Sequence, residues 1–155
     1  MGGILELLLA NKEDVTAVTV SDTTHQISAI TMATSAKFKT YYFNPETGNF
    51  TSTYQINKQN GVRFVQSLIT LLFGRMNTAK RIEMTALAQN DLVAIVKDAN
   101  GAYWYFGYDE PVTAQSATGQ TGTARTDRNG YDLTLVDNSL GLPYEVDPDI
   151  IEDLV

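Results

Sequence analysis

The residues of this chain that could perform chemistry are few, and their spacing matches no familiar catalytic site. The sequence has 155 residues, no cysteine and one histidine, His25, which lies in a polar turn region. The absence of cysteine excludes disulfides, thiolate metal sites and a cysteine nucleophile. A Ser-His-Asp triad would need a serine on a nucleophile elbow, and no serine has the flanking glycines of that motif. We therefore expect His25 to be an exposed turn residue.

Acidic residues offer two further candidate sites. Asp109 and Glu110 directly follow an aromatic segment, and glycoside hydrolysis would require them to face another acid across a cleft. The acids of residues 147–155 could supply oxygen ligands to a hard cation, but they lack the central glycine and the spacing of an EF-hand. We expect Asp109 and Glu110 to be acidic residues of a loop. We expect residues 147–155 to be an acidic, partly disordered C-terminal tail. The tail also carries apolar residues that could dock on a neighbouring subunit: Ile150, Ile151 and Leu154.

Residues 119–123 contain two glycines, which would let backbone N–H groups approach a phosphate. A P-loop, however, requires Gly-Lys-Ser/Thr leading into a helix. Here Gly122 is followed by Thr123, Ala124 and then a predicted strand. We predict that these glycines provide loop flexibility or close subunit packing and do not bind a nucleotide.

The aromatic run over residues 103–108 could stack on sugars or bases. Strand alternation places Trp104, Phe106 and Tyr108 on one face, which we expect to be the core. Tyr103 and Tyr105 then remain for a partner. An interface between subunits accounts for such tyrosines as well as a ligand site does.

The elements that position these residues are mostly predicted β-strands. Residues 5–9 fit either a strand or one helical turn, and residues 62–73, long and apolar on two faces, fit either a strand or a core helix. Turn chemistry at 44–49, at Asn60-Gly61 and at 98–101 separates neighbouring strands. Alternation and β-branched content predict the remaining strands at residues 15–20, 26–32, 37–43, 50–57, 92–97, 102–108 and 131–136.

One amphipathic helix is predicted near residues 78–89, with its apolar stripe formed by Ala79, Ile82, Ala86 and Leu87. Residues 111–129 are rich in small and polar side chains and predict a long loop, mobile or ordered by a partner. The predicted fold class is therefore mainly β: an antiparallel β-barrel or sandwich with one flanking α-helix. Residues 1–146 form a single β-rich domain in this prediction, followed by the acidic tail at 147–155.

The charge and the apolar runs restrict the partners. A net charge of −7 repels phosphate, so specific nucleic-acid binding is not expected unless the 11 basic residues cluster on one surface. A wall that nucleic acid must slide past should be neutral or negative. No basic residue precedes the leucine-rich start, and no apolar run approaches about 20 residues, so we predict neither a signal peptide nor a membrane span.

Segments along nearly the whole chain carry a family resemblance. In order they are GGI at 2–4, LANKEDV at 9–15, GVRF at 61–64, LLF at 71–73, KRIE at 80–83, LVAIVKD at 92–98, GAYW at 101–104, GQTGTA at 119–124, NGYDLTL at 129–135 and YEV at 144–146. The succession resembles structural tail-tube and ring (connector) proteins of tailed phages that infect Bacteroidales, including crAss-like phages.

The resemblance implies a virion structural protein, assembled in the host cytoplasm and located in the phage tail or connector. It implies a tail-tube-like β fold, a homo-oligomeric ring of roughly six or twelve copies, and contacts with neighbouring tail, ring or portal proteins. DNA would pass through the lumen without specific binding. The resemblance transfers no catalytic residue, cofactor or metal, and no membrane partner, so we predict a non-enzymatic protein.

In such a ring, subunits would pack the face of residues 64–73 around a closed axis. The candidate interface residues are Phe64, Leu68, Leu71, Phe73, Tyr103, Tyr105, Gly119, Gln120, Gly122, Arg125 and Arg128. The competing prediction is a glycan- or receptor-binding β module of a virion, in which Tyr103, Tyr105 and residues 119–128 hold the ligand. An enzyme would instead require a concave pocket with convergent titratable side chains.

Overall fold

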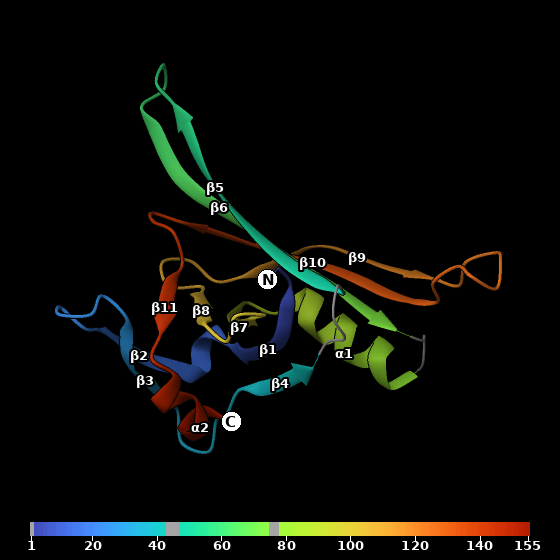
Figure 1. Ribbon diagram of the computed structural model, residues 1–155, viewed down its shortest axis with the longest axis horizontal. Helices are drawn as coiled ribbons and strands as arrows, with labels where there is room; N and C mark the ends of the chain where they lie inside the picture. Colours follow the sequence, from blue (N-terminus) through green and yellow to red (C-terminus); the bar gives the residue numbers. More distant parts are fainter. Residues whose placement is uncertain (1, 43–46, 75–77) are drawn as a thin grey trace.

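The chain folds as two β-sheets that face each other across a hydrophobic core (Figure 1). The computed structural model describes residues 2–42, 47–74 and 78–155. Within these residues, neighbouring strands are antiparallel except for one parallel pair, β3 with β11. The predicted mainly β fold class is confirmed. Of the two predicted architectures, the described strands form no closed barrel, and their arrangement is sandwich-like.

Sheet A contains seven strands and sheet B contains four. In spatial order, sheet A consists of β2 (Val15–Val20), β3 (Ile27–Met32), β11 (Tyr144–Val146), β8 (Tyr103–Phe106), β7 (Leu92–Asp98), β1 (Ile4–Asn11) and β4 (Lys39–Tyr42). Sheet B consists of β5 (Gly48–Asn57), β6 (Val62–Gly74), β10 (Gly130–Ser139) and β9 (Thr113–Gln120). The helices are α1 (Thr78–Gln89) and α2 (Ile151–Leu154), with short 3-10 turns at η1 (Lys12–Asp14) and η2 (Pro148–Ile150).

The strands β1 and β7 of sheet A are buried on both faces. On β1, Leu7 and Leu9 enter the core between the sheets, which we call core 1, whereas Leu8 and Ala10 enter a second core on the opposite face, core 2. The residues of β7 divide between the two cores in the same way. Where a strand is covered on both sides, consecutive residues must be apolar, which explains the apolar runs at residues 7–10 of β1 and 92–96 of β7. Residues 5–9 are therefore strand, and the helical-turn alternative is wrong.

The C-terminal residues complete core 2. Ile151 and Leu154 of α2 are buried, and the Leu154 carbonyl accepts a hydrogen bond from the backbone N–H of Phe38 at 2.8 Å. The Asp147 side chain accepts from the N–H of Asp149 and so begins the turn that leads into α2. The apolar side chains of the tail thus dock on this chain's own core, which corrects the prediction of a partly disordered tail docking on a neighbour.

Sheet B has one covered face and one open face. Along β6, alternate residues from Val65 to Leu71 are buried, while Phe64, Leu68 and Leu72 point the other way and are half-buried. Residues 62–73 are therefore a strand, and the core-helix alternative is wrong. The buried Ser67 shares a hydrogen bond of 2.8 Å with the hydroxyl of Ser52 on β5.

The hairpin of β5 and β6 projects beyond the rest of the molecule (Figure 1). Its turn contains Gly61 at φ +65°, as the Asn60-Gly61 pair predicted. Near this turn three large apolar side chains are exposed: Tyr54 by 51%, Ile56 by 58% and Val62 by 43%. The predicted turn at residues 44–49 lies partly outside the described residues.

The prediction of a long loop at residues 111–129 is largely wrong. Thr113–Gln120 forms β9, which pairs with β10 in antiparallel orientation. The register of this pair shifts once, between Thr134 and Leu135 of β10. The backbone of β10 offers a row of hydrogen-bonding groups, and this pairing overrides the weak strand propensity of the small and polar residues. Only residues 121–129 connect the two strands. Within that connection the Asp127 carboxylate accepts from the N–H groups of Thr123 and Ala124, at 2.8 Å each.

Helix α1 has the predicted bounds but a different buried side. Met84 enters core 1 and Leu87 packs against it, whereas Ile82 is 61% exposed. Glu83 of α1 forms an ion pair with Lys39 of β4. The helix contacts the rest of the molecule mainly along β9, so only the side around Met84 is covered.

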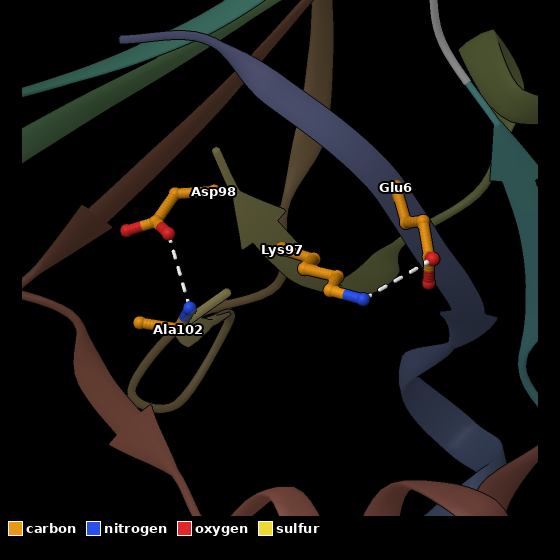
Figure 2. A network of polar contacts seen from close by, with 4 residues as sticks. All are labelled: Glu6, Lys97, Asp98 and Ala102. Atoms are coloured by element: carbon orange, nitrogen blue, oxygen red, sulfur yellow. Dashed lines mark hydrogen bonds and ion pairs between the residues drawn. The ribbon is translucent and has the colours of Figure 1, made fainter. Parts of the chain in front are cut away.

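The hairpin of β7 and β8 is confirmed with its turn. The Asp98 carboxylate accepts hydrogen bonds from the N–H group of Asn100 and from that of Ala102, the second of which is drawn in Figure 2. Beside this turn, Lys97 Nζ lies 3.5 Å from Oε1 of Glu6 on β1. The pair links β7 to its neighbour on the face of sheet A that carries core 2.

Candidate functional site

Two of the predicted interface residues lie on the open face of sheet B. Phe64 and Leu68 are half-buried there, together with Leu72 on β6 and Val136 on β10, which is the register partner of Leu68. We call these four residues the outer strip. The remaining positions of this face are mainly polar, so the strip is an apolar band on an otherwise hydrophilic surface.

Two predicted interface residues are buried inside the chain. Leu71 points into core 1 because alternation along β6 places it opposite to Leu68 and Leu72. Tyr105, only 1% exposed, belongs to core 2 because the residues of α2 cover this face of sheet A. Neither side chain is accessible to a partner, which corrects the prediction for both. Phe73 is partly buried against core 1, with its ring 6.0 Å from that of Tyr41 in an edge-to-face contact.

Tyr103 remains partly exposed, and its ring already receives a cation. Lys97 Nζ lies 5.5 Å from the ring centroid. The carboxylate of Glu6, followed by Tyr103 itself, raises the pKa of Lys97 above its ordinary value. The accessible side of this tyrosine thus belongs to a polar cluster on sheet A.

The other predicted interface residues gather at one end of sheet B. Gly119 and Gln120 lie in β9, and Gly122 follows with φ +71°, a conformation that favours glycine. Arg125 is exposed, whereas Arg128 pairs with the carboxylate of Asp132. Because Gly119 is paired to β10, residues 119–123 do not form a phosphate cradle.

The predicted residues therefore do not form one surface. The strand register places the β9–β10 connection at the end of sheet B opposite to the projecting β5–β6 hairpin. Figure 1 shows the connection and the hairpin at opposite ends of the molecule, with β8 between them in the other sheet. A ligand site built jointly from Tyr103, Tyr105 and residues 119–128 is not formed.

The structure also contains a polar cavity that sequence reasoning missed. It has a volume of about 280 Å³ and lies among the end of β8, the end of β10 and the connection from β10 to β11. Asp137 and Tyr105 form its buried part, and the rings of Tyr108 and Tyr144 lie 4.9 Å apart at its rim. Oδ2 of Asp109 accepts a hydrogen bond of 2.9 Å from the N–H of Leu140.

Asp137 is the electrostatically unusual residue of this cavity. Its side chain is 4% exposed, and Oδ1 has no hydrogen-bond partner among the described residues; the same holds for Oη of Tyr105. Burial raises the pKa of Asp137 to about 6, although the backbone N–H of Gly107 stabilises the carboxylate and Asp109 acts in the raising direction. Burial also raises the pKa of Tyr105, and the charge of Asp137 adds to that effect.

A signal for Asp137 was present in the sequence. The predicted strand at residues 131–136 placed Tyr131, Leu133 and Leu135 on one face, and two residues further along the same alternation lies Asp137. The structure extends this strand to Ser139, so the acid falls on the inward face. Because the predicted strand ended at Val136, the burial of the Asp137 carboxylate was not predicted.

The other candidate residues, His25 and the acidic residues considered as cation ligands, do not form a site in the described part of the chain. His25 lies in a turn with φ +57° and is exposed. Within residues 2–42, 47–74 and 78–155, no group of three or more His, Cys, Asp or Glu side chains is arranged to hold a metal ion. None of the helices in this part of the chain is long and apolar enough to cross a membrane.

Comparisons with protein-family models, curated proteins and solved structures return no match to this chain. The resemblance to phage tail and ring proteins therefore stays a prediction that rests on the residues alone.

Proposed function

We propose that this protein is a non-enzymatic structural subunit that assembles with copies of itself into a ring of a phage tail or portal-tail connector. The observation that carries the proposal is that sheet B has an uncovered face and two edge strands without an outer neighbour among the described residues. Its outer strip is uncovered, and its edge strands β5 and β9 each pair on one side only within the described residues. Its long hairpin extends away from the body (Figure 1).

Open strand edges and projecting apolar side chains favour association. An unpaired edge presents N–H and C=O groups to any neighbouring strand, and monomeric proteins usually blunt such edges. The β5–β6 hairpin exposes Tyr54, Ile56 and Val62 near its tip, where one copy of the chain cannot cover them. A neighbouring copy that packs on the hairpin would remove this apolar surface from water.

The two ends of sheet B are chemically different, which favours a head-to-tail contact. One end carries the apolar hairpin tip, and the other carries the β9–β10 connection with the exposed Arg125. An interface between two different surfaces of the same chain repeats from copy to copy and closes into a ring if the rotation allows. The net charge of −7 suits a ring whose lumen lets DNA pass without adhering.

The competing functions have less support. The glycan- or receptor-binding module needed Tyr105 and residues 119–128 on one surface, but Tyr105 is buried and the two regions lie apart. The cavity around Asp137 does meet the geometric condition set for an enzyme. A two-carboxylate mechanism would also need Asp109, however, and this side chain is held by the backbone N–H of Leu140.

Mass photometry and negative-stain electron microscopy of the purified full chain test the proposal. We expect concentration-dependent association into closed rings of uniform diameter. A chain that stays monodisperse and monomeric at every concentration would contradict the proposal, and so would its absence from the traced density of a tailed-phage virion encoding it.

A further inference from the structure

The cavity of about 280 Å³ around Asp137 contains two buried oxygen atoms that nothing in the described chain satisfies. Oδ1 of Asp137 and Oη of Tyr105 both lack a hydrogen-bond partner, and the two side chains are 4% and 1% exposed. A buried polar atom without a partner costs about 1–3 kcal/mol. Because an ionised carboxylate only accepts hydrogen bonds, the missing partner of Asp137 is a donor.

The charges around the cavity favour a cationic donor. Asp109 lines the cavity with Asp137, and the charges of Asp109 and Glu110 both act on Asp137. The one basic side chain with a resolved effect on Asp137 is Lys12, whose Nζ donates to the carbonyl oxygens of Gly107 and Tyr108. Lys12 is thus directed to the main chain, and the acidic charge of the cavity exceeds the basic charge.

The rim of the cavity suits an organic cation better than a bare metal ion. Tyr108 and Tyr144 present two aromatic rings, which attract ammonium and guanidinium groups. Leu140 and Leu142 line the same cavity, are 77% and 55% exposed, and can cover an aliphatic stem. A hard cation such as calcium is usually held by several carboxylates, and within the described residues no group of three or more His, Cys, Asp or Glu side chains is arranged to hold a metal ion.

We propose that this cavity is a binding site for a guanidinium or alkylammonium group, which donates to the buried oxygens of Asp137 and Tyr105 while its stem packs on the tyrosine and leucine rim. The cation has two chemical sources. One is a free organic amine, and the other is a basic side chain of a second copy of this chain.

The second source connects the site to the proposed ring and rests on that function. Arg125 is exposed on the β9–β10 connection, and the cavity lies beside Ser139 at the other end of β10. In a head-to-tail contact the connection of one copy would approach the cavity of the next.

Titration with L-arginine amide, followed by ¹H–¹⁵N correlation spectra, tests the site itself. With the α-amino group of each compound acetylated, so that only the head group differs in charge, we expect saturable shifts of the amide signals of Gly107 and Leu140 with the arginine amide and no saturable shift with the citrulline amide. Asp137→Asn should weaken binding at least about tenfold, while Asp22→Asn, in an exposed turn, should leave it unchanged. Tyr105→Phe serves as the second variant and should weaken binding by about threefold or more.

Equal responses to arginine amide and citrulline amide, or unchanged affinity in a folded Asp137→Asn variant, would overturn the proposal. Circular dichroism establishes that each variant is folded. Sedimentation velocity then separates the two sources. If arginine amide and Arg125→Ala both reduce self-association, a second copy supplies the cation. If the amide binds but association is unaffected, the site takes a free amine. If the amide binds to a strictly monomeric chain, the site is supported and the ring proposal fails.

Discussion

Nε1 of Trp104 donates a hydrogen bond to Oδ2 of Asp98 at 3.0 Å, which ties a strand residue of β8 to the turn that precedes it. The other carboxylate oxygen accepts from the N–H groups of Asn100 and Ala102, at 2.8 and 3.0 Å. Partial burial alone would raise the pKa of Asp98, but the bonds from Trp104 and from the backbone outweigh it and leave the pKa below its ordinary value. One carboxyl group therefore holds both the turn and the indole.

Replacing Asp98 by alanine should lower the free energy of unfolding by about 2–3 kcal/mol, because three hydrogen bonds of about 1 kcal/mol each are lost. Urea denaturation at pH 7 measures the change. Asp22→Ala is the matched control, since Asp22 is exposed in another turn, and it should change stability by less than about 0.5 kcal/mol. Equal effects of the two substitutions would contradict this role of Asp98.

Asp137 should make the protein less stable as the pH rises. Burial raises its pKa in the folded state to about 6, against about 4 in the unfolded chain, so the folded state binds the proton more tightly. Beyond burial, Gly107 N–H and Lys12 lower this pKa, whereas Asp109 and Glu110 raise it. The stability that protonation provides is fully present below pH 4 and is lost through pH 6, an amount of about 3 kcal/mol.

Asp137→Asn removes this titration. Denaturation of the wild type and the variant between pH 4.5 and 7.5 should show the difference in stability moving in favour of the variant as the pH rises. Comparing the two proteins cancels the opposite trend of carboxyls such as Asp98, whose lowered pKa adds stability above pH 4. A difference that stays constant across this range would show that Asp137 does not titrate as proposed.

Gly130→Ala should destabilise the end of sheet B at which β6 finishes and β10 begins. Gly130 pairs with Gly74 on β6, and a Cβ at this position would overlap the carbonyl oxygen of Phe73. Because that atom is backbone, the strands must separate locally, at a cost of about 1–3 kcal/mol. Gly141→Ala is the control, since a Cβ there meets no atom within 4 Å. Thermal unfolding followed by circular dichroism measures both, and similar melting temperatures would contradict the expected clash.

Substitutions on the two faces of β6 should separate assembly from folding. Leu68→Lys, in the outer strip, should reduce self-association about tenfold or more while changing the unfolding free energy by less than about 1 kcal/mol. Leu71→Ala, in core 1, should instead lower stability by about 2–5 kcal/mol. Mass photometry and urea denaturation measure the two effects. Unchanged association of folded Leu68→Lys would exclude the outer strip from the interface.

The projecting hairpin supplies an independent test of assembly. Replacing both Ile56 and Val62 by serine should weaken ring formation with little change in the melting temperature, because both side chains are largely exposed in the single chain. Thr53→Ser on the same strand is the control and should leave ring formation unchanged. Rings that form equally well from the double variant would show that the hairpin tip is not at the interface.

Several parts of the fold follow from the sequence because they depend on residues that are close together in the chain. The turn after Asp98 and the turn at Gly61 were predicted from their residue types, since side-chain caps and positive φ are local properties. Helix α1 and strand β5 were predicted from their periodicity alone. In each case, the determining interactions span only a few residues.

Other features were decided only by contacts between distant residues. β9 is a strand because β10 lies beside it, and β11 is a strand because it fits between β3 and β8. Tyr105 is buried because the far end of the chain, with Leu154, covers the second face of sheet A. The cavity at Asp137 likewise needs β8 and the β10–β11 connection together. Strand alternation in the sequence determines which residues share a face, but which face is covered depends on the layer that packs on it, and only the tertiary structure supplies that layer.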